Sequence, residues 1–122
     1  MSTPTTVTVA TLDHGPVTFP EPSWCTGHAE HLVEALVDVA HHGPEQPLMF
    51  GNEPLFLAAL VQDPFTSRGS RDVGLYVEQT GYAATMAPQD VDALADALVS
   101  AASRLRHMAR GLAVVRSGGE AR

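Results

Sequence analysis

Hydrophobic and polar positions alternate with a period of two near the start of the chain. β-Branched residues dominate residues 5–12, and Val7 and Val9 fall on one face of an extended segment. Residues 13–15 carry turn-forming side chains, and residues 16–19 can return as a second strand. The pattern therefore predicts an N-terminal β-hairpin.

Residues 29–42 carry two competing patterns. The apolar residues fit the stripe of a helix, and polar residues spaced by four make an opposite ridge. These apolar residues are Leu32, Val33, Leu36, Val37 and Ala40. A strand over residues 36–41 is the alternative, and Gly43-Pro44 ends either element. The pattern alone favours a helix through the first half of the segment.

The middle of the chain predicts four more strands. Residues 48–50 and 55–61 flank a tight turn and read as a pair. A polar loop over residues 63–72 leads to a strand over residues 73–79. A Thr-Gly turn then lets residues 82–86 pair back.

The last quarter of the chain repeats apolar residues at spacings of three and four without a break. This apolar seam consists of Val91, Leu94, Leu98, Ala101, Leu105, Met108, Leu112 and Val115. It predicts one helix over about residues 88–116, with Pro88 at the first position, where its missing N–H costs nothing. Such a helix is roughly 40 Å long, so we expect its C-terminal half to extend past the sheet. Residues 117–122 are expected to be a disordered tail.

Together these elements predict a single α+β domain over residues 1–116. Its architecture is an antiparallel sheet of about five or six strands with one long C-terminal helix.

Charge is segregated along the predicted helix. Acidic residues lie in the N-terminal half and arginines in the C-terminal half; they are Asp90, Asp92, Asp96, Arg104, Arg106, Arg110 and Arg116. The charges either compensate the helix dipole or pair two antiparallel helices. We expect a homodimer formed through this helix.

Composition excludes some classes of function. The chain has 122 residues and a formal net charge of −7, which disfavours binding to nucleic acid phosphates. No apolar run is long enough to span a membrane, and the first residues do not read as a signal peptide. The expectation is a cytoplasmic protein.

The segment Pro22-Ser23-Trp24-Cys25-Thr26-Gly27-His28 concentrates the candidate chemistry. It holds the single cysteine and the single tryptophan of the chain. Cys25 and His28 have C-x2-H spacing, and His41 or His42 could supply a third ligand for zinc. Possible fourth ligands are Glu21, His31 and Asp38. Alternatively, Cys25 and Trp24 are core residues and the histidines lie on the surface.

Three other stretches and the Ala-rich C-terminal helix join this motif in a resemblance to a family of small uncharacterised actinobacterial proteins. The stretches are Leu12-Asp13-His14-Gly15-Pro16-Val17, Asp38-Val39-Ala40-His41-His42-Gly43-Pro44-Glu45 and Leu60-Val61-Gln62-Asp63-Pro64-Phe65. The family pattern carries a second cysteine four residues before the position of Cys25, where this chain has Glu21. The resemblance implies a Cys-Cys-His-His type of site that includes His41, with Glu21 either replacing a cysteine as an oxygen ligand or marking a degenerate site. It also favours a strand over residues 36–41.

These observations lead to one main hypothesis and two alternatives. The main one is a non-catalytic binding or regulatory module with an unknown protein partner, stabilised by zinc at Cys25, His28 and His41 with Glu21 as the fourth ligand. The first alternative is a small zinc-dependent hydrolytic enzyme whose metal keeps an open position for water. The second is an interaction protein without metal, which works through its helix.

Overall fold

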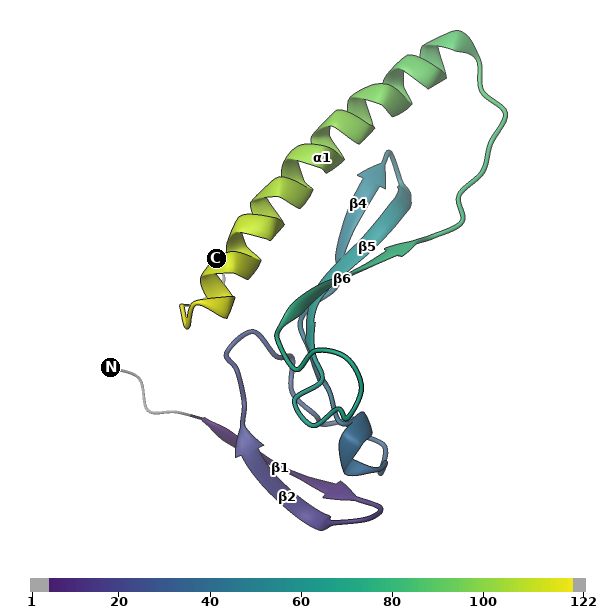
Figure 1. Cartoon of the computed structure of the whole chain (residues 1–122). Coiled ribbons are helices and arrows are strands. Elements are labelled where there is room, and N and C mark those ends of the chain that lie inside the picture. The colour runs from purple at the N-terminus through teal and green to yellow at the C-terminus, as the bar shows by residue number, and fades with distance from the viewer. Residues whose placement is uncertain (1–4, 120–122) are drawn as a thin grey trace.

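The computed structural model describes residues 5–119, which form an α+β fold (Figure 1). Six strands make two antiparallel sheets, and one long helix follows them in the chain. The elements are β1 (Thr6–Thr11), β2 (Gly15–Pro20), the 3-10 turn η1 (Leu36–Asp38), β3 (His41–His42), β4 (Gln46–Phe50), β5 (Glu53–Gln62), β6 (Gly74–Gln79) and α1 (Pro88–Arg116). The predicted fold class is therefore confirmed.

Strands β1 and β2 form the predicted hairpin. Val9 faces Val17 and Val7 faces Phe19 in the antiparallel register. Val9 and Phe19 are buried with Val39, which comes from the segment after η1. This small apolar cluster packs the hairpin against the rest of the chain.

Strand β5 is the centre of the second sheet. Ala58 pairs with Gln46 of β4 and also with Val77 of β6, so β4 and β6 lie on opposite edges of β5. His42 of β3 pairs with Val61 near the other end of β5. Since Val61 also pairs with β6, β3 and β4 lie one after the other along the same edge. The predicted pairing of residues 48–50 with 55–61 is confirmed.

The predicted helix over the first half of residues 29–42 is absent. Only η1 is helical in this segment, and the predicted strand is reduced to His41–His42. Leu32 and Val33 are 83% and 54% exposed, because no apolar surface packs against the stripe they were expected to form. The segment is fixed instead by polar contacts to the hairpin, such as the backbone N–H of Leu36, which donates to Asp13 Oδ1 at 2.9 Å.

The predicted strand over residues 82–86 is also absent. The chain leaves the sheet after β6 and runs without strand pairing to the start of α1 (Figure 1). Thr80 marks the departure, since its hydroxyl donates to the carbonyl oxygen of Pro54. Residues 82–86 thus have no partner strand.

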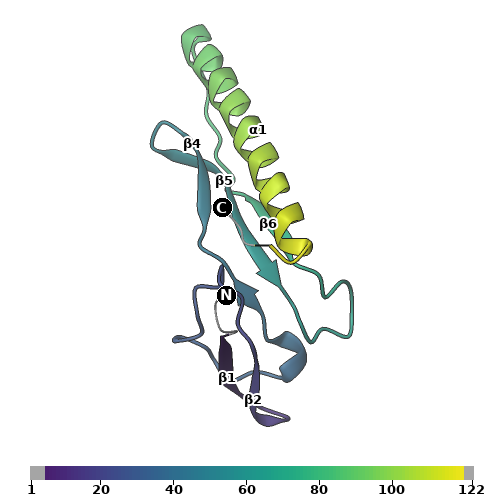
Figure 2. The same ribbon diagram turned by 90° about the vertical axis from the view of Figure 1, so that its left-hand side faces the viewer.

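Helix α1 has the predicted bounds, and its C-terminal half packs on one face of the second sheet (Figure 2). Met108 and Leu112 lie beside Leu60 and Leu75 of the sheet. Arg104 and Arg116 attach the helix further by donating to backbone carbonyl oxygens of the sheet region, at 2.8 and 2.7 Å. The apolar side chains in the C-terminal half of α1 therefore pack on the chain's own sheet.

The free end of α1 is its N-terminal end, not the C-terminal end that we expected to extend past the sheet. The first turns lie beyond the tip of the β4–β5 hairpin (Figure 1). Val91 and Leu98 belong to the seam but are 51% and 44% exposed. The expectation was wrong because the connection from β6 carries the chain past the tip before the helix begins and runs back.

The C-terminal end of α1 is closed by a Schellman motif. Gly118 has a φ of 92° and its N–H donates to Val115 O, while the N–H of Gly119 donates to Val114 O. Part of the predicted disordered tail thus forms an ordered cap, and residues 120–122 lie outside the described residues. In the part of the chain that the structure describes, no helix has the length and apolar character needed to cross a membrane.

Candidate metal centre

The loop after β2 supplies three of four clustered side chains. The backbone N–H of Cys25 donates to Pro22 O at 3.1 Å, which makes a turn. Gly27 takes a φ of 97°, a conformation that glycine adopts without a steric penalty. These bends bring Glu21, Cys25 and His28 close together.

Strand β3 supplies the fourth side chain, His41. The strand pairs with the end of β5, where His41 faces Gln62. Thr26 fastens the loop to β3, because its backbone N–H and its hydroxyl both donate to His42 O, at 2.9 and 3.1 Å. The cluster therefore lies where the loop after the hairpin meets the second sheet.

One ligand atom from each of these residues lies within 4.8 Å of the other three. We call Glu21, Cys25, His28 and His41 the Glu-Cys-His-His cluster. Cys25 Sγ is 3.7 Å from His28 Nε2, which is 3.2 Å from Glu21 Oε1. A tetrahedral zinc ion with ordinary bond lengths holds its donor atoms about 3.3–3.8 Å apart. The spacing of the cluster is close to that of a tetrahedral site.

Within the cluster, the ring of His41 has no hydrogen bond, whereas His28 Nε2 is within hydrogen-bond distance of both Cys25 Sγ and Glu21 Oε1. His41 is 2% exposed, and its Nδ1 lies 2.8 Å from Glu21 Oε1. Despite this short distance the two atoms are not aligned for a hydrogen bond, and Nδ1 has no hydrogen-bond partner among the described residues. A buried ring nitrogen without a partner is costly. A cation bound between Nδ1 and the carboxylate would satisfy both atoms.

Aromatic rings hold the two histidines of the cluster in place. The ring of Phe19 lies 5.4 Å from that of His41 and 6.1 Å from that of His28, measured between centroids. Trp24 lies edge-on to His41 at 6.1 Å. The histidine and glutamate side chains of the cluster are at most 13% exposed. The site is thus preformed and shielded, which is typical of structural metal sites.

Burial sets the electrostatics of the cluster. It raises the pKa of the Cys25 thiol, and the nearby Glu21 carboxylate raises it further, although the N–H of Gly27 donates to Sγ and opposes this. Burial also lowers the pKa of His41, against the opposing charge of Glu21. A neutral imidazole is the form that binds metal. For Cys25, in contrast, these effects favour the neutral thiol, and a bound cation would favour the thiolate beside the Glu21 carboxylate.

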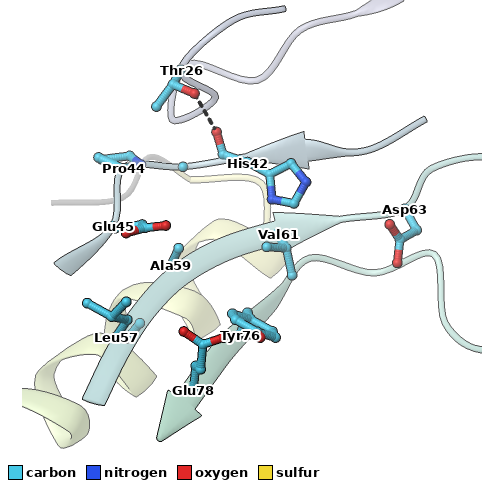
Figure 3. Close-up of a pocket in the computed structure, with 12 residues that line it drawn as sticks. Thr26, His42, Pro44, Glu45, Leu57, Ala59, Val61, Asp63, Tyr76 and Glu78 are labelled. Carbon is cyan, nitrogen blue, oxygen red and sulfur yellow. Dashed lines mark hydrogen bonds between the residues drawn. The ribbon is translucent and has the colours of Figure 1, made fainter. Parts of the chain in front are cut away.

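The other candidate ligands lie outside the cluster. The ring of His42 lies beside Val61 in the hollow drawn in Figure 3. Because side chains alternate along a strand, it is on the opposite side of β3 from His41. His31 Nε2 contacts the carbonyl oxygen of Ala10 at 3.2 Å, and Asp38 is exposed in η1. Among the sequence candidates, the structure brings together Glu21, Cys25, His28 and His41.

Sequence reasoning missed the role of Phe19 beside the two histidines. Phe19 was predicted to lie in the hairpin. The sequence pattern of a strand, however, does not show which residues of a distant loop pack against it. The structure thus defines an α+β domain with a Glu-Cys-His-His cluster between its two sheets, in which His41 is buried and the other three residues are half-buried.

The chain belongs to the DUF6907 family, a domain of unknown function, whose model matches residues 6–114. This agrees with the resemblance to an uncharacterised family. No curated protein and no solved structure matches the chain.

Proposed function

We propose that this chain is a small non-catalytic module in which a zinc ion, bound by the Glu-Cys-His-His cluster, holds the N-terminal hairpin to the second sheet. The observation that carries the proposal is the buried Nδ1 of His41. It lies 2.8 Å from Glu21 Oε1 without a hydrogen bond, in a group of four donor atoms within 4.8 Å of one another.

The donor set favours zinc over other common cations. It combines one thiolate sulfur, two imidazole nitrogens and one carboxylate oxygen. Calcium and magnesium prefer sites made only of oxygen ligands. Zinc accepts sulfur, nitrogen and oxygen ligands in a four-coordinate tetrahedral site.

A structural role is better supported than a hydrolytic one. Hydrolytic zinc sites keep one position open for water, whereas here Glu21 supplies a fourth protein ligand. The small size of the hydrophobic core also favours a stabilising metal ion. Few large hydrophobic side chains are buried among the described residues, and the main cluster consists of Val9, Phe19 and Val39. A domain with so small a core gains stability from a metal.

The metal content of untagged protein tests the proposal. We expect about one zinc per chain, and an X-ray absorption spectrum with one sulfur ligand at about 2.3 Å and three nitrogen or oxygen ligands at about 2.0–2.1 Å. Cys25→Ser should lose the sulfur contribution and most of the zinc. His14→Ala is the matched control, since this exposed histidine lies in the hairpin turn, and it should keep the metal.

Two results would contradict the structural zinc site. Wild-type protein without metal, even after refolding with zinc, would remove the site altogether. A spectrum with two sulfur ligands would show that the ion bridges two chains, because each chain has one cysteine.

We also propose that the module is a homodimer whose α1 helices pair in antiparallel orientation. Val91, Leu98 and Val99 are 51%, 44% and 70% exposed on the helix. Arg104 and Arg116 bind the chain's own backbone. An antiparallel pair would bring the remaining basic positions of one helix opposite the acidic positions of the other; they are Arg106, Arg110, Asp92 and Asp96.

Sedimentation equilibrium tests this assembly. The wild-type chain should be dimeric, and Arg106→Glu with Arg110→Glu should dissociate it by placing like charges opposite each other. Mixing that variant with Asp92→Arg and Asp96→Arg should restore a mixed dimer. Arg68→Glu, in the loop before β6, serves as a control for charge reversal away from α1. A wild-type chain that stays monomeric at high micromolar concentration would contradict the proposal.

A further inference from the structure

The face of the second sheet that points away from α1 carries a broad hollow. Its volume is about 700 Å³. The floor is apolar and comes from β5, where Leu57, Ala59 and Val61 project to the same side (Figure 3). Thr26 and His42 form one wall, next to the loop that carries Cys25. No other strand or helix of the described residues covers this face (Figure 2).

Carboxylates surround this apolar floor. Glu45 lies on the side of the β3–β4 edge, Glu78 projects from β6, and Asp63 follows β5 (Figure 3). Tyr76 is 52% exposed beside the floor, and its hydroxyl donates to Glu78 Oε1 at 3.1 Å. Neither arginine nor lysine lines the hollow, so its potential is negative.

We propose that this hollow binds a segment of a partner protein that presents apolar side chains together with arginine or lysine. Leu57, Ala59 and Val61 would bury the apolar side chains. The basic side chains would reach the surrounding carboxylates, while the ring of Tyr76 offers a flat surface to a guanidinium group.

Charge argues for this occupant over a second copy of the chain. A symmetric pairing of two such faces would bring Glu45, Glu78 and Asp63 of both copies together, and like charges across an interface are costly. Nucleic acid is disfavoured for the same reason. The floor belongs to the second sheet, and only the wall formed by Thr26 and His42 adjoins the proposed zinc site.

Backbone amide chemical shifts measured by NMR test the proposal, with a short synthetic peptide of alternating arginine and leucine as the probe. The peptide should shift the amides of Leu57, Ala59 and Val61 in a saturable manner. The same peptide with glutamine in place of arginine should bind several-fold more weakly, and the glutamate version should not bind. Added salt should weaken binding of the arginine peptide.

Variants at the rim provide the second measurement. Glu45→Gln with Glu78→Gln should weaken binding of the arginine peptide by about two- to fivefold per carboxylate, as expected for exposed ion pairs. Glu53→Gln with Asp72→Asn, two carboxylates outside the hollow, is the matched control and should leave the affinity unchanged. Equal binding of the arginine and glutamine peptides, or shifts confined to other surfaces, would overturn the proposal.

Discussion

Single polar side chains join parts of this chain that lie far apart in the sequence. His41 reaches from β3 to the loop that carries Glu21, and its Nδ1 lies 2.8 Å from the carboxylate. Asp13, in the hairpin turn, accepts a hydrogen bond from the backbone N–H of Leu36 at 2.9 Å. Each contact fixes an irregular segment that forms few backbone hydrogen bonds of its own.

Asp13 provides a prediction about pH. The hydrogen bond from Leu36 N–H, assisted by the adjacent His14, lowers the pKa of its carboxyl group below the usual value of 3.8. The bond to the carboxylate therefore stabilises the fold above the pKa of the unfolded chain, and this contribution is lost as pH falls through the folded-state pKa. Carboxyl-carbon NMR titration should give a midpoint below 3.8 for Asp13, and a midpoint at or above that value would contradict the contact. Asp13→Asn should lack this contribution to acid sensitivity.

The candidate ligands were largely predictable because their signal is local. Cys25 and His28 have the spacing of a metal-binding turn, and Glu21 lies four residues before the cysteine. Only the alternation of β3 separates His41 from His42, however, and this strand is too short to have a pattern of its own. The edge-on and tilted contacts of Phe19 with the two histidines depend on the tertiary fold, which the sequence pattern does not show.

Among the elements, α1 and the β1–β2 hairpin follow from short-range patterns. An unbroken heptad seam and a Pro at the first position determine the helix, whose bounds match the prediction. The failures lie where a periodic pattern has no surface to pack on. Leu32 and Val33 have helical spacing but stay 83% and 54% exposed. Residues 82–86 have no partner strand, although the ring of Tyr82 lies edge-on to Phe50 of β4. Periodicity can report burial only where a partner surface exists.

Two glycines of the helix region should respond to alanine in opposite ways. Gly111 lies inside α1, and an added Cβ would meet no atom within 4 Å. Gly111→Ala should therefore raise the free energy of unfolding by about 0.5–1 kcal/mol. Gly118 has a φ of 92° in the Schellman cap, so Gly118→Ala should lower the free energy of unfolding by about 1–2 kcal/mol. Urea denaturation measures both, and a shift of the same sign in both variants would contradict the helix end described above.

At the scale of the whole molecule, the chain has two sheets and little buried apolar surface between them. The hairpin contacts the rest through the cluster of Val9, Phe19 and Val39, the ring of Phe65 and the Glu-Cys-His-His cluster. The sequence predicted the α+β class and about five or six strands in one sheet, but the strand predicted over residues 82–86 does not form and the six observed strands make two sheets. The sequence does not show that β2 has no partner strand in the second sheet. Turn residues and prolines mark the end of a strand in the same way whether the next strand joins the same sheet or another one.

Thermal unfolding with and without a zinc chelator tests the central claim most directly. A ligand that binds only the folded state raises its stability, so chelation should lower the Tm of the wild-type chain, and added zinc should restore it. Cys25→Ser should start with a lower Tm and should respond little to the chelator, whereas His14→Ala should behave like the wild type. A wild-type Tm that is the same with chelator, with zinc and with neither would contradict a metal that holds the hairpin to the second sheet.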